Sequence, residues 1–500
     1  MSSSIVFGLL AHGYSMTNQI QFHDDVASAF DFGPMFTHGR WANYILLKLF
    51  RFFLGGDVVS LAFFNTLTAI LLLALMAAMI LRILKIENPR FAAAIGGMII
   101  VFPPITSVLG YRFMAYTYAF AYLLTVLGVY LITNTKLRVS IKVISFIVLQ
   151  TFAMGIYQAT IPFFLSLIVL YLFRRSVDED SSWKVYWIRI VKWASVCVAS
   201  TITYLAITFG LNSLKGIQLS SYQNIRGLGL GQGLVADYPR RLLLACWRII
   251  VEPINAYGDM YPMSIRLFYY ILLAIAVALA LLLLANVFRQ SRSKGYQCII
   301  LLCGMPLSIN FIYVMCGEGS FIYALMEFSK IFIFICPCLF MELAVAHSYL
   351  TGRQVKNFKK SVLIVLGIMG FLYIRLANLC YLKAEYVQTR AISYFTVLQT
   401  RIQGVPGYKE SYPLIFVNEN NKSHLSVACT TQLQNINIHP YSDSVINNHA
   451  WKQFMALWVG YAPEVLGVEV LKNPHEVENM PHYPNEGSIQ IIEGKIVVNF

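Results

Sequence analysis

Apolar runs of about 20 residues recur along this 500-residue chain, separated by short segments that carry Lys and Arg. A run of that length is enough for an α-helix to cross the hydrocarbon core of a bilayer. Only 12% of the residues are charged, against roughly 25% in soluble domains, and 58% are hydrophobic. The pattern therefore predicts a polytopic α-helical membrane protein with the lipid bilayer as its surroundings.

We expect about eleven transmembrane helices, each an apolar run bounded by charged or turn-forming residues. The N-terminal run lacks the basic region and cleavage site of a signal peptide, so it is counted as a membrane segment. The expected spans are 4–18, 58–82, 91–110, 113–133, 140–155, 158–173, 188–210, 264–287, 296–315, 331–349 and 361–382.

The distribution of Lys and Arg predicts the orientation of these spans. One set of loops carries 18 Lys and Arg, whereas the opposite short connections carry 5. The positive-inside rule makes the first set cytoplasmic, so the N-terminus is inside and the C-terminus outside. The first set is 82–90, 134–142, 174–192, 286–294 and 351–360, and the second is 18–57, 103–113, 155–160 and 316–330.

Two domains are expected: a membrane domain at 1–382 with external loops 18–57 and 211–263, and an extracytoplasmic domain at 383–500. The tail differs in composition, with 8 basic and 10 acidic residues, while the whole chain has a net charge of +14. We expect it to be a small α+β domain with a helix near 385–403, a strand at "YPLIFV", a helix near 445–459 and a closing hairpin that turns at Glu493-Gly494.

The net positive charge does not indicate a nucleic-acid partner, because it is concentrated in the loops of the positive-inside pattern. The nine cysteines are scattered, and the "CPC" at Cys336 and Cys338 lacks the second pair that a zinc site of this kind needs. The cysteines therefore predict neither a disulfide nor a metal site.

Two adjacent carboxylates, Asp24 and Asp25, lie beside His23 in the first external loop. One interpretation is that they are solvated loop residues or cap a short helix. The other is that one of them is a general base that takes a proton from an attacking hydroxyl. Adjacent side chains rarely aim at one atom, so in that case the second would orient or hold a ligand.

The same loop continues with "THGRW", which ends at Arg40 and Trp41. The planar guanidinium of Arg40 matches a phosphate or carboxylate, and the ring of Trp41 offers a flat face for a sugar. Both residue types are also common at membrane interfaces. The apolar "WANYILLKLFRFFLGG" that begins at Trp41, with Lys48 and Arg51 along it, predicts a helix lying in the interface.

Further polar residues are expected on the same side of the membrane at the ends of other spans. Arg112 and Lys330 are candidates for binding a phosphate, with interface anchoring as the alternative. Further candidates for contacts to a ligand, which could be a sugar, are His23, Trp41, Tyr157, Gln158, Glu318 and Glu327.

No P-loop, GxGxxG, HExxH or Ser-His-Asp pattern occurs in a supporting context. The Gly-rich "GLGLGQG" in loop 211–263 faces the exterior in this topology, so we interpret it as a mobile loop that closes over a substrate. An enzyme working outside has no access to cytosolic nucleotide sugars, which favours a donor carried on a lipid.

These features together resemble the GT-C glycosyltransferases, and more closely the Gtr-type serotype-converting O-antigen glucosyltransferases of bacteria and phages. The resemblance rests on "FHDD" followed by "GRW", on "YQAT" at an external turn, and on the closing "MPHYPNEGSIQIIEGKIVVNF". It extends from the first loop to the tail.

The resemblance implies transfer of glucose from undecaprenyl-phosphate glucose to a sugar of the lipopolysaccharide O-antigen, on the periplasmic side of the bacterial inner membrane. Asp24 or Asp25 would be the base of an inverting displacement. Arg40, Arg112 and Lys330 would stabilise the departing lipid phosphate. No metal is required, although the carboxylate pair could hold Mg²⁺. The tail would shape the acceptor site or hold the polymer.

Two alternatives remain open from the sequence. One is another GT-C transferase that uses a different sugar or a different acceptor, such as lipid A, teichoic acid or protein. The other is a flippase or transporter of a lipid-linked sugar, for which broken helices in two similar halves would be expected. No such repeat is visible in this chain.

Overall fold

The computed structural model describes residues 1–28, 35–54, 60–134, 136–220, 234–255, 263–316, 322–419, 430–473 and 475–500. The chain forms two compact units, and both are discontinuous in sequence. Unit 1 contains Met1–Asn18 and Pro34–Asn378, and unit 2 contains Gln19–Gly33 and Leu379–Phe500.

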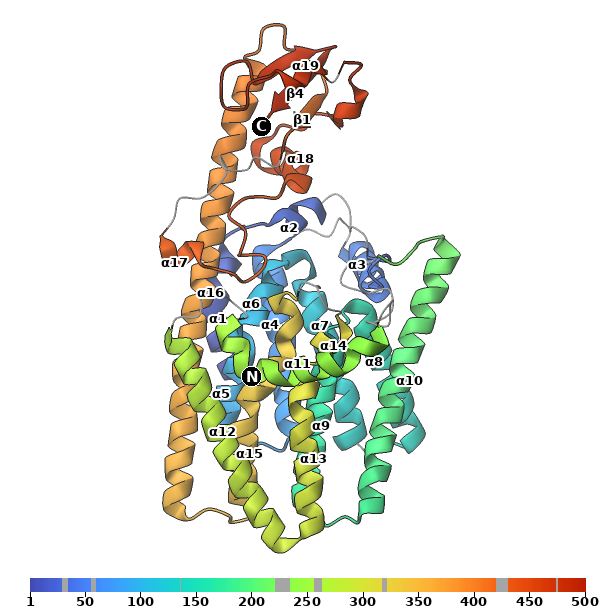
Figure 1. Ribbon diagram of the computed structural model, residues 1–500, viewed down its shortest axis with the longest axis vertical. Coiled ribbons are helices and arrows are strands. Elements are labelled where there is room, and N and C mark those ends of the chain that lie inside the picture. Colours follow the sequence, from blue (N-terminus) through green and yellow to red (C-terminus); the bar gives the residue numbers. More distant parts are fainter. Residues whose placement is uncertain are drawn as a thin grey trace. The chain divides into compact units, whose positions relative to one another are not determined.

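Unit 1 is built entirely of helices in its described residues (Figure 1). They are α1 (Ser2–Thr17), α3 (Trp41–Leu54), α4 (Ala62–Ile83), α5 (Pro89–Val101), α6 (Pro103–Gly110), α7 (Arg112–Asn134), α8 (Val139–Ile156), α9 (Thr160–Asp178), α10 (Trp183–Lys215), α11 (Leu234–Asn255), α12 (Met263–Gln290), α13 (Arg292–Ile309), α14 (Ile312–Met315), the 3₁₀ helix η3 (Ala324–Lys330), α15 (Ile331–Ala346) and the part of α16 (Gly352–Gln403) up to Asn378.

Eight helices in the described residues are long and apolar enough to cross a membrane, or nine if the bent pair α5 and α6 counts as one span. The chain is therefore a polytopic helical protein, as expected, but the count of eleven is not confirmed. Helices occupy all eleven expected positions, yet α1, with 16 residues, and α13 are not among the candidate spans. Two apolar runs in the sequence thus form helices that do not meet the requirements of a full span.

The bend between α5 and α6 occurs at the expected Pro103-Pro104 turn, where the two helix axes differ by 42°. Pro103 occupies the first turn of α6, where its missing N–H costs no hydrogen bond, but it ends the preceding helix at Val101. The second expected turn, at Tyr157 and Gln158, separates α8 from α9. The second break places the buried side chains of Tyr157 and Gln158 at helix ends inside unit 1.

The sequence predicts an external loop at 211–263 without any helix of its own, but its second half contains the 22-residue helix α11. In Figure 1, α11 lies crosswise to the long helices α12 and α13. Its exposed side chains include Leu243, Trp247 and Ile250, a composition typical of a helix that lies along a membrane surface. The Gly-rich segment at 221–233, interpreted above as a mobile loop, lies outside the described residues.

Unit 2 combines a four-stranded mixed sheet with short helices and the end of α16. The strands β1 (Leu414–Val417), β2 (Val465–Leu466), β3 (Ile489–Ile492) and β4 (Lys495–Asn499) lie in the order β2-β1-β4-β3. Strand β1 is parallel to both β2 and β4, and β3 and β4 are antiparallel. The helical elements are α2 (His23–Ser28), α17 (Thr431–Gln434), η5 (Asn448–Ala450), α18 (Trp451–Phe454), η6 (Met455–Val459), η7 (Val468–Val470) and α19 (His475–Glu478).

The closing hairpin has the predicted strands and the predicted turn. Glu493 and Gly494 connect β3 to β4 with φ angles of 50° and 71°. Two consecutive positive φ angles are the signature of the type I′ turn, whose twist matches that of an antiparallel pair. The strand at "YPLIFV" and the helical segment near 445–459 are also present, as β1 and as η5, α18 and η6.

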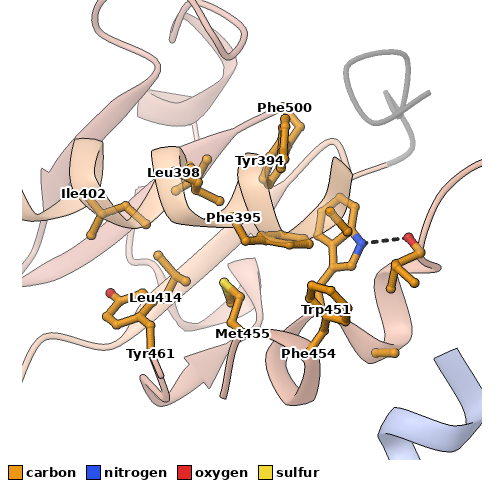
Figure 2. Close-up of a cluster of buried hydrophobic side chains, with 14 of the residues drawn as sticks. Tyr394, Phe395, Leu398, Ile402, Leu414, Trp451, Phe454, Met455, Tyr461 and Phe500 are labelled. Atoms are coloured by element: carbon orange, nitrogen blue, oxygen red, sulfur yellow. Dashed lines mark hydrogen bonds between the residues drawn. The ribbon is translucent and has the colours of Figure 1, made fainter. Parts of the chain in front are cut away.

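An aromatic core holds unit 2 together (Figure 2). Trp451 is 1% exposed, and its Nε1 donates a hydrogen bond to the carbonyl oxygen of Ile446 at 2.9 Å. Phe395 from α16 and Phe500 at the end of the chain pack against the Trp451 ring. Val26 from α2 lies in the same cluster. The segment with the acidic pair therefore packs with the tail, whereas the boundary predicted at 382/383 would assign it to the membrane domain.

Candidate functional site

The acidic pair lies in the single-turn helix α2, in which Val26 N–H donates to the carbonyl oxygen of Phe22 at 3.0 Å. Consecutive side chains on a helix diverge, so the two carboxylates meet different surroundings. Asp25 is 1% exposed, while the side chain of Asp24 keeps 43% of its surface accessible. Only Asp24 is accessible from outside unit 2.

Side-chain hydrogen bonds hold the segment before α2 in place. The backbone N–H of Gln21 donates to Gln388 Oε1 at 2.7 Å, and Gln388 Nε2 donates to the carbonyl oxygen of Gln19 at 2.9 Å. Trp458 Nε1 donates to Gln21 Oε1 at 3.0 Å. Residues from α16 and the tail thereby fix the backbone that carries the acidic pair.

Three histidines and a second aspartate of unit 2 surround Asp24. Its Oδ1 lies 3.5 Å from His449 Nε2 and 3.8 Å from His23 Nε2. His23 Nδ1 lies 3.8 Å from Asp443 Oδ2, and the rings of His23 and His439 have centroids 6.1 Å apart. The sequence pointed to His23 but not to the three tail residues, which are His439, Asp443 and His449. The polar stretch "NIHPYSDSVINNHAW" that contains them was the available signal.

The electrostatics of this cluster favour a charged Asp24. Burial acts to raise the pKa of Asp24, but a hydrogen bond from His449 and the charges of His23, His449 and His439 outweigh it, so the pKa falls below its usual 3.8. Burial lowers the pKa of His439, with His23 acting in the same direction and Asp443 and Asp24 opposing it. The cluster therefore combines an ionised carboxylate with a largely neutral imidazole near neutral pH.

In unit 1, Arg40 lies against two stacked tyrosines. Arg40 Nη1 donates to Tyr118 Oη at 3.0 Å, and its guanidinium carbon is 5.6 Å from the centroid of the Tyr157 ring. The Tyr118 and Tyr157 rings are stacked with centroids 4.3 Å apart. Arg40 as a whole residue is partly buried, and its Nε is enclosed, so the two tyrosines form a rigid aromatic support for the guanidinium.

Gln158 and Trp41 pack against residues of unit 1: Gln158 bonds to the backbone just before Arg40, and Trp41 directly follows Arg40. Gln158 Nε2 donates to the carbonyl oxygen of His38 at 2.6 Å and to Tyr204 Oη at 2.9 Å. Trp41 is 6% exposed and fits against Gly155, where a Cβ would approach its ring to 2.7 Å. A sugar cannot stack on a ring enclosed in this way, so Trp41 here is a packing residue rather than an open platform.

Arg112 is 2% exposed at the start of α7. Its Nη2 donates to the carbonyl oxygen and to the hydroxyl of Ser15, at 2.8 and 2.9 Å. Asn65 Nδ2 donates to the carbonyl oxygen of Arg112 at 3.1 Å. These contacts tie α1, α4 and α7 together, and they place a buried cation at the junction of the three helices.

Glu327 and Lys330 form a buried ion pair in η3, with Lys330 Nζ 2.5 Å from Glu327 Oε1. The hydroxyl of Tyr313 donates to the same carboxylate oxygen, and the guanidinium of Arg248 lies 4.3 Å from the Tyr313 ring centroid. The sequence pointed to Lys330 and Glu327 as separate candidates, for a phosphate and for a sugar or acceptor, and did not point to Tyr313 or Arg248. Because Arg248 is in α11, the helix not anticipated from the sequence, no local pattern pointed to it.

A run of aromatic rings connects Arg40 with this ion pair. Tyr157 contacts Tyr122 edge to face, and Tyr122 contacts Phe328 of η3 with centroids 4.8 Å apart. Arg40, Tyr157, Glu327 and Lys330 therefore belong to one packed region of unit 1. Glu318 lies outside the described residues.

Within the part of the chain that the structure describes, two groups of side chains have metal-ligand geometry, and both are in unit 2. One is His23, His439 and Asp443, and the other is His23, Asp24 and His449. Neither group consists of the adjacent carboxylates alone, which were the Mg²⁺ ligands considered from the sequence.

Comparison with known proteins gives a family match. Residues 13–334 match the family model described as glucosyl transferase GtrII. The matched range includes the acidic pair and all three candidate phosphate-binding cations, and it ends before the tail. No curated protein and no solved structure matches the chain.

Proposed function

Because the chain belongs to the glucosyl transferase GtrII family and is a glycosyltransferase, we propose that it transfers glucose from undecaprenyl-phosphate glucose to the O-antigen at the periplasmic face of the bacterial inner membrane. The observation that carries the proposal is the family match over residues 13–334, which includes the acidic pair and its candidate cationic partners. The candidate membrane spans support a donor held in the bilayer.

We propose Asp24 as the general base. An acceptor hydroxyl on a polysaccharide can reach only an accessible carboxylate, and Asp24 is accessible whereas Asp25 is 1% exposed. The acceptor oxygen attacks the anomeric carbon of glucose, its proton passes to the Asp24 carboxylate, and the bond from the anomeric carbon to the lipid phosphate oxygen breaks. The products are an inverted glucoside and undecaprenyl phosphate.

Among the three candidate cations, Arg40 has the features best suited to the departing phosphate. Its planar fork can bind two phosphate oxygens, the stacked tyrosines hold it in position, and the residue is only partly buried. Lys330 is neutralised by Glu327, and Arg112 is buried against Ser15. In this proposal Arg112 contributes through its positive potential, whereas Glu327 largely offsets the charge of Lys330. Glu318 remains a proposed contact to sugar or acceptor. The other candidates for that role are buried like Trp41, with exposed fractions of 6% for His23, 2% for Tyr157, 9% for Gln158 and 3% for Glu327.

The decisive experiment measures the O-antigen by mass and linkage in cells that express the wild type, Asp24→Asn or Asp25→Asn. We expect one added hexose with the wild type and none with Asp24→Asn. In membranes supplied with undecaprenyl-phosphate glucose, the rate should fall about 10²–10⁴-fold, as is typical on loss of a general base. Glu410→Gln, at an exposed acidic site in unit 2, is the matched control.

Protein levels of all variants are compared by immunoblot. Unmodified O-antigen in wild-type cells, with the lipid-linked glucose merely moved between leaflets, would support the flippase alternative instead. Transfer from a different polyprenyl-phosphate sugar, or to lipid A, teichoic acid or protein, would keep the enzyme class and replace the proposed donor or acceptor.

A further inference from the structure

We propose that His23, His439 and Asp443 form a binding site for a divalent transition-metal ion, with Zn²⁺ as the best fit. The two imidazole nitrogens and the carboxylate oxygen all lie within 4.8 Å of one another. His23 comes from the segment that follows α1, and the other two residues come from the tail, so the ion would join distant parts of the chain within unit 2.

The ligand types select the class of metal. Two imidazoles with one carboxylate suit Zn²⁺ and its neighbours in the first transition row, whereas Mg²⁺ and Ca²⁺ take oxygen ligands. Three protein ligands leave a fourth tetrahedral position open to water or another group. The site is therefore different in chemistry from a Mg²⁺ ion held by adjacent carboxylates.

The spacing fits an ion between the ligands. His23 Nδ1 and Asp443 Oδ2 are 3.8 Å apart. In a tetrahedral site, two ligand atoms that each lie about 2.0–2.2 Å from Zn²⁺ are about 3.3–3.6 Å from one another. A bound ion would draw the two side chains slightly closer without a change in the backbone.

The remaining nitrogen of His23 supports the assignment. His23 Nε2 faces Asp24 Oδ1 at 3.8 Å, on the opposite side of the ring from Asp443. A histidine that binds a metal through one nitrogen commonly presents the other N–H to a carboxylate, which fixes the ring and its tautomer. Asp24 is thus a positioning residue for the metal site: its carboxylate would accept the N–H of His23 and orient the ring toward the ion.

The backbone around the tail ligands is anchored in advance. Lys383 Nζ, from α16, donates to the carbonyl oxygens of Ser442 at 2.9 Å and Ile436 at 3.4 Å, on either side of His439. The buried ring of Tyr441 packs edge to face against Phe22, next to His23. Ligands on pre-positioned backbone lose little freedom when an ion binds.

The test uses the full-length protein, purified in detergent, stripped with a chelator and then titrated with ZnCl₂. Metal content is measured by mass spectrometry and the unfolding midpoint by a thermal scan. We expect about one site-bound Zn²⁺ per chain and a midpoint that rises with Zn²⁺, because an ion that binds only the folded state stabilises it. Co²⁺ in place of Zn²⁺ should give visible absorption bands of a low-symmetry, four-coordinate site.

Variants separate the proposed ligands from their neighbours. His439→Asn and Asp443→Asn should each remove the site-bound ion, whereas Asp24→Asn should weaken binding about 10–100-fold. The matched control is His475→Asn, because His475 is an exposed histidine in unit 2, 3.2 Å from Glu478, and should leave binding unchanged. Zinc held elsewhere, for example by cysteines, would persist in all four variants.

Three results would overturn the proposal. They are no zinc-dependent change in the wild type, equal binding by wild type and Asp443→Asn, or loss of binding in His449→Asn with retention in Asp443→Asn. The last result would assign the ion to His23, Asp24 and His449. If His439→Asn misfolds, as judged by its midpoint without zinc, the partly exposed Asp443 gives the decisive variant. Neither readout depends on sugar transfer, so this proposal and the proposed function can fail separately.

Discussion

At the scale of single residues, the two adjacent aspartates Asp24 and Asp25 differ in burial, although the sequence gives no difference between them. The identities of Asp24 and Asp25 and the helical turn that starts there predict that the two carboxylates point in different directions. The sequence does not predict which one is buried, because the partners are distant: Asp24 contacts His449 in the tail. Pairing over such separations depends on the folding of unit 2 and leaves no local pattern.

Glu493 provides a test of pH dependence at this scale. Backbone N–H groups of Lys472 and Asn473 donate to its carboxylate, and chiefly the bond from Lys472 lowers the pKa of Glu493 below its usual 4.5. A carboxyl group with a lowered pKa in the folded state stabilises that state above its unfolded pKa, and the stabilisation disappears as the pH falls through the folded value.

We therefore expect Glu493→Gln to lower the unfolding midpoint of the full-length protein near neutral pH. The difference from the wild type should be complete above pH 4.5 and should shrink as the pH is lowered further. Thermal scans across this range measure it. Glu486→Gln, at a nearby exposed site, is the control. A difference that grows on acidification would contradict the assigned contacts.

At the scale of helices and strands, apolar runs located the long helices well because a bilayer demands a fixed length of apolar residues. Hydropathy alone could not separate a full span from a shorter apolar helix such as α1. With 16 residues, α1 is shorter than the candidate spans. The helix α11 was missed because Arg240 and Arg241 interrupt its apolar residues. The hairpin β3–β4 was predictable because its turn chemistry is local.

The turn before α3 gives a prediction at this scale. Gly39 has φ +68°, and an added Cβ would lie 2.6 Å from Tyr204 Oη and 3.2 Å from Gln158 Nε2. Gly39→Ala should therefore destabilise the protein by about 1–3 kcal/mol, the usual range for a strained backbone position. Because Arg40 follows directly, we also expect a higher KM for the lipid donor.

Gly13→Ala is the matched control for Gly39→Ala. It lies inside α1, and nothing described lies within 4 Å of its added Cβ, so we expect a neutral effect or a gain of up to about 1 kcal/mol. Thermal scans and transfer rates at several donor concentrations check both variants. Equal stability of Gly39→Ala and the wild type would show that the turn relaxes without strain.

At the scale of the whole molecule, the distribution of Lys and Arg gives a prediction that the fold alone does not test. Basic residues gather in alternate connections between the expected spans, which predicts a cytoplasmic N-terminus and a periplasmic C-terminus. The proposed reaction requires this orientation, because donor and acceptor meet on the periplasmic side.

Fusions of reporters to the full-length chain test the orientation. Alkaline phosphatase after Phe500 should be active and green fluorescent protein at the same site dark. The same reporters inserted at 347–351, in the connection between α15 and α16, should give the opposite result. A fluorescent C-terminal fusion would reverse the predicted orientation and place the tail away from the proposed acceptor.

Because unit 2 combines residues from both ends of the chain, it can fold only after the tail has been synthesised. Gln21 bonds to Gln388, 367 positions later in the chain. At about 5–20 residues per second, the ribosome needs roughly 20–70 s to deliver that partner. During this delay Phe22 and Val26 lack the tail side chains that bury them in the folded protein. A transcript cut short before the tail would therefore yield inserted helices whose acidic pair never acquires its native surroundings.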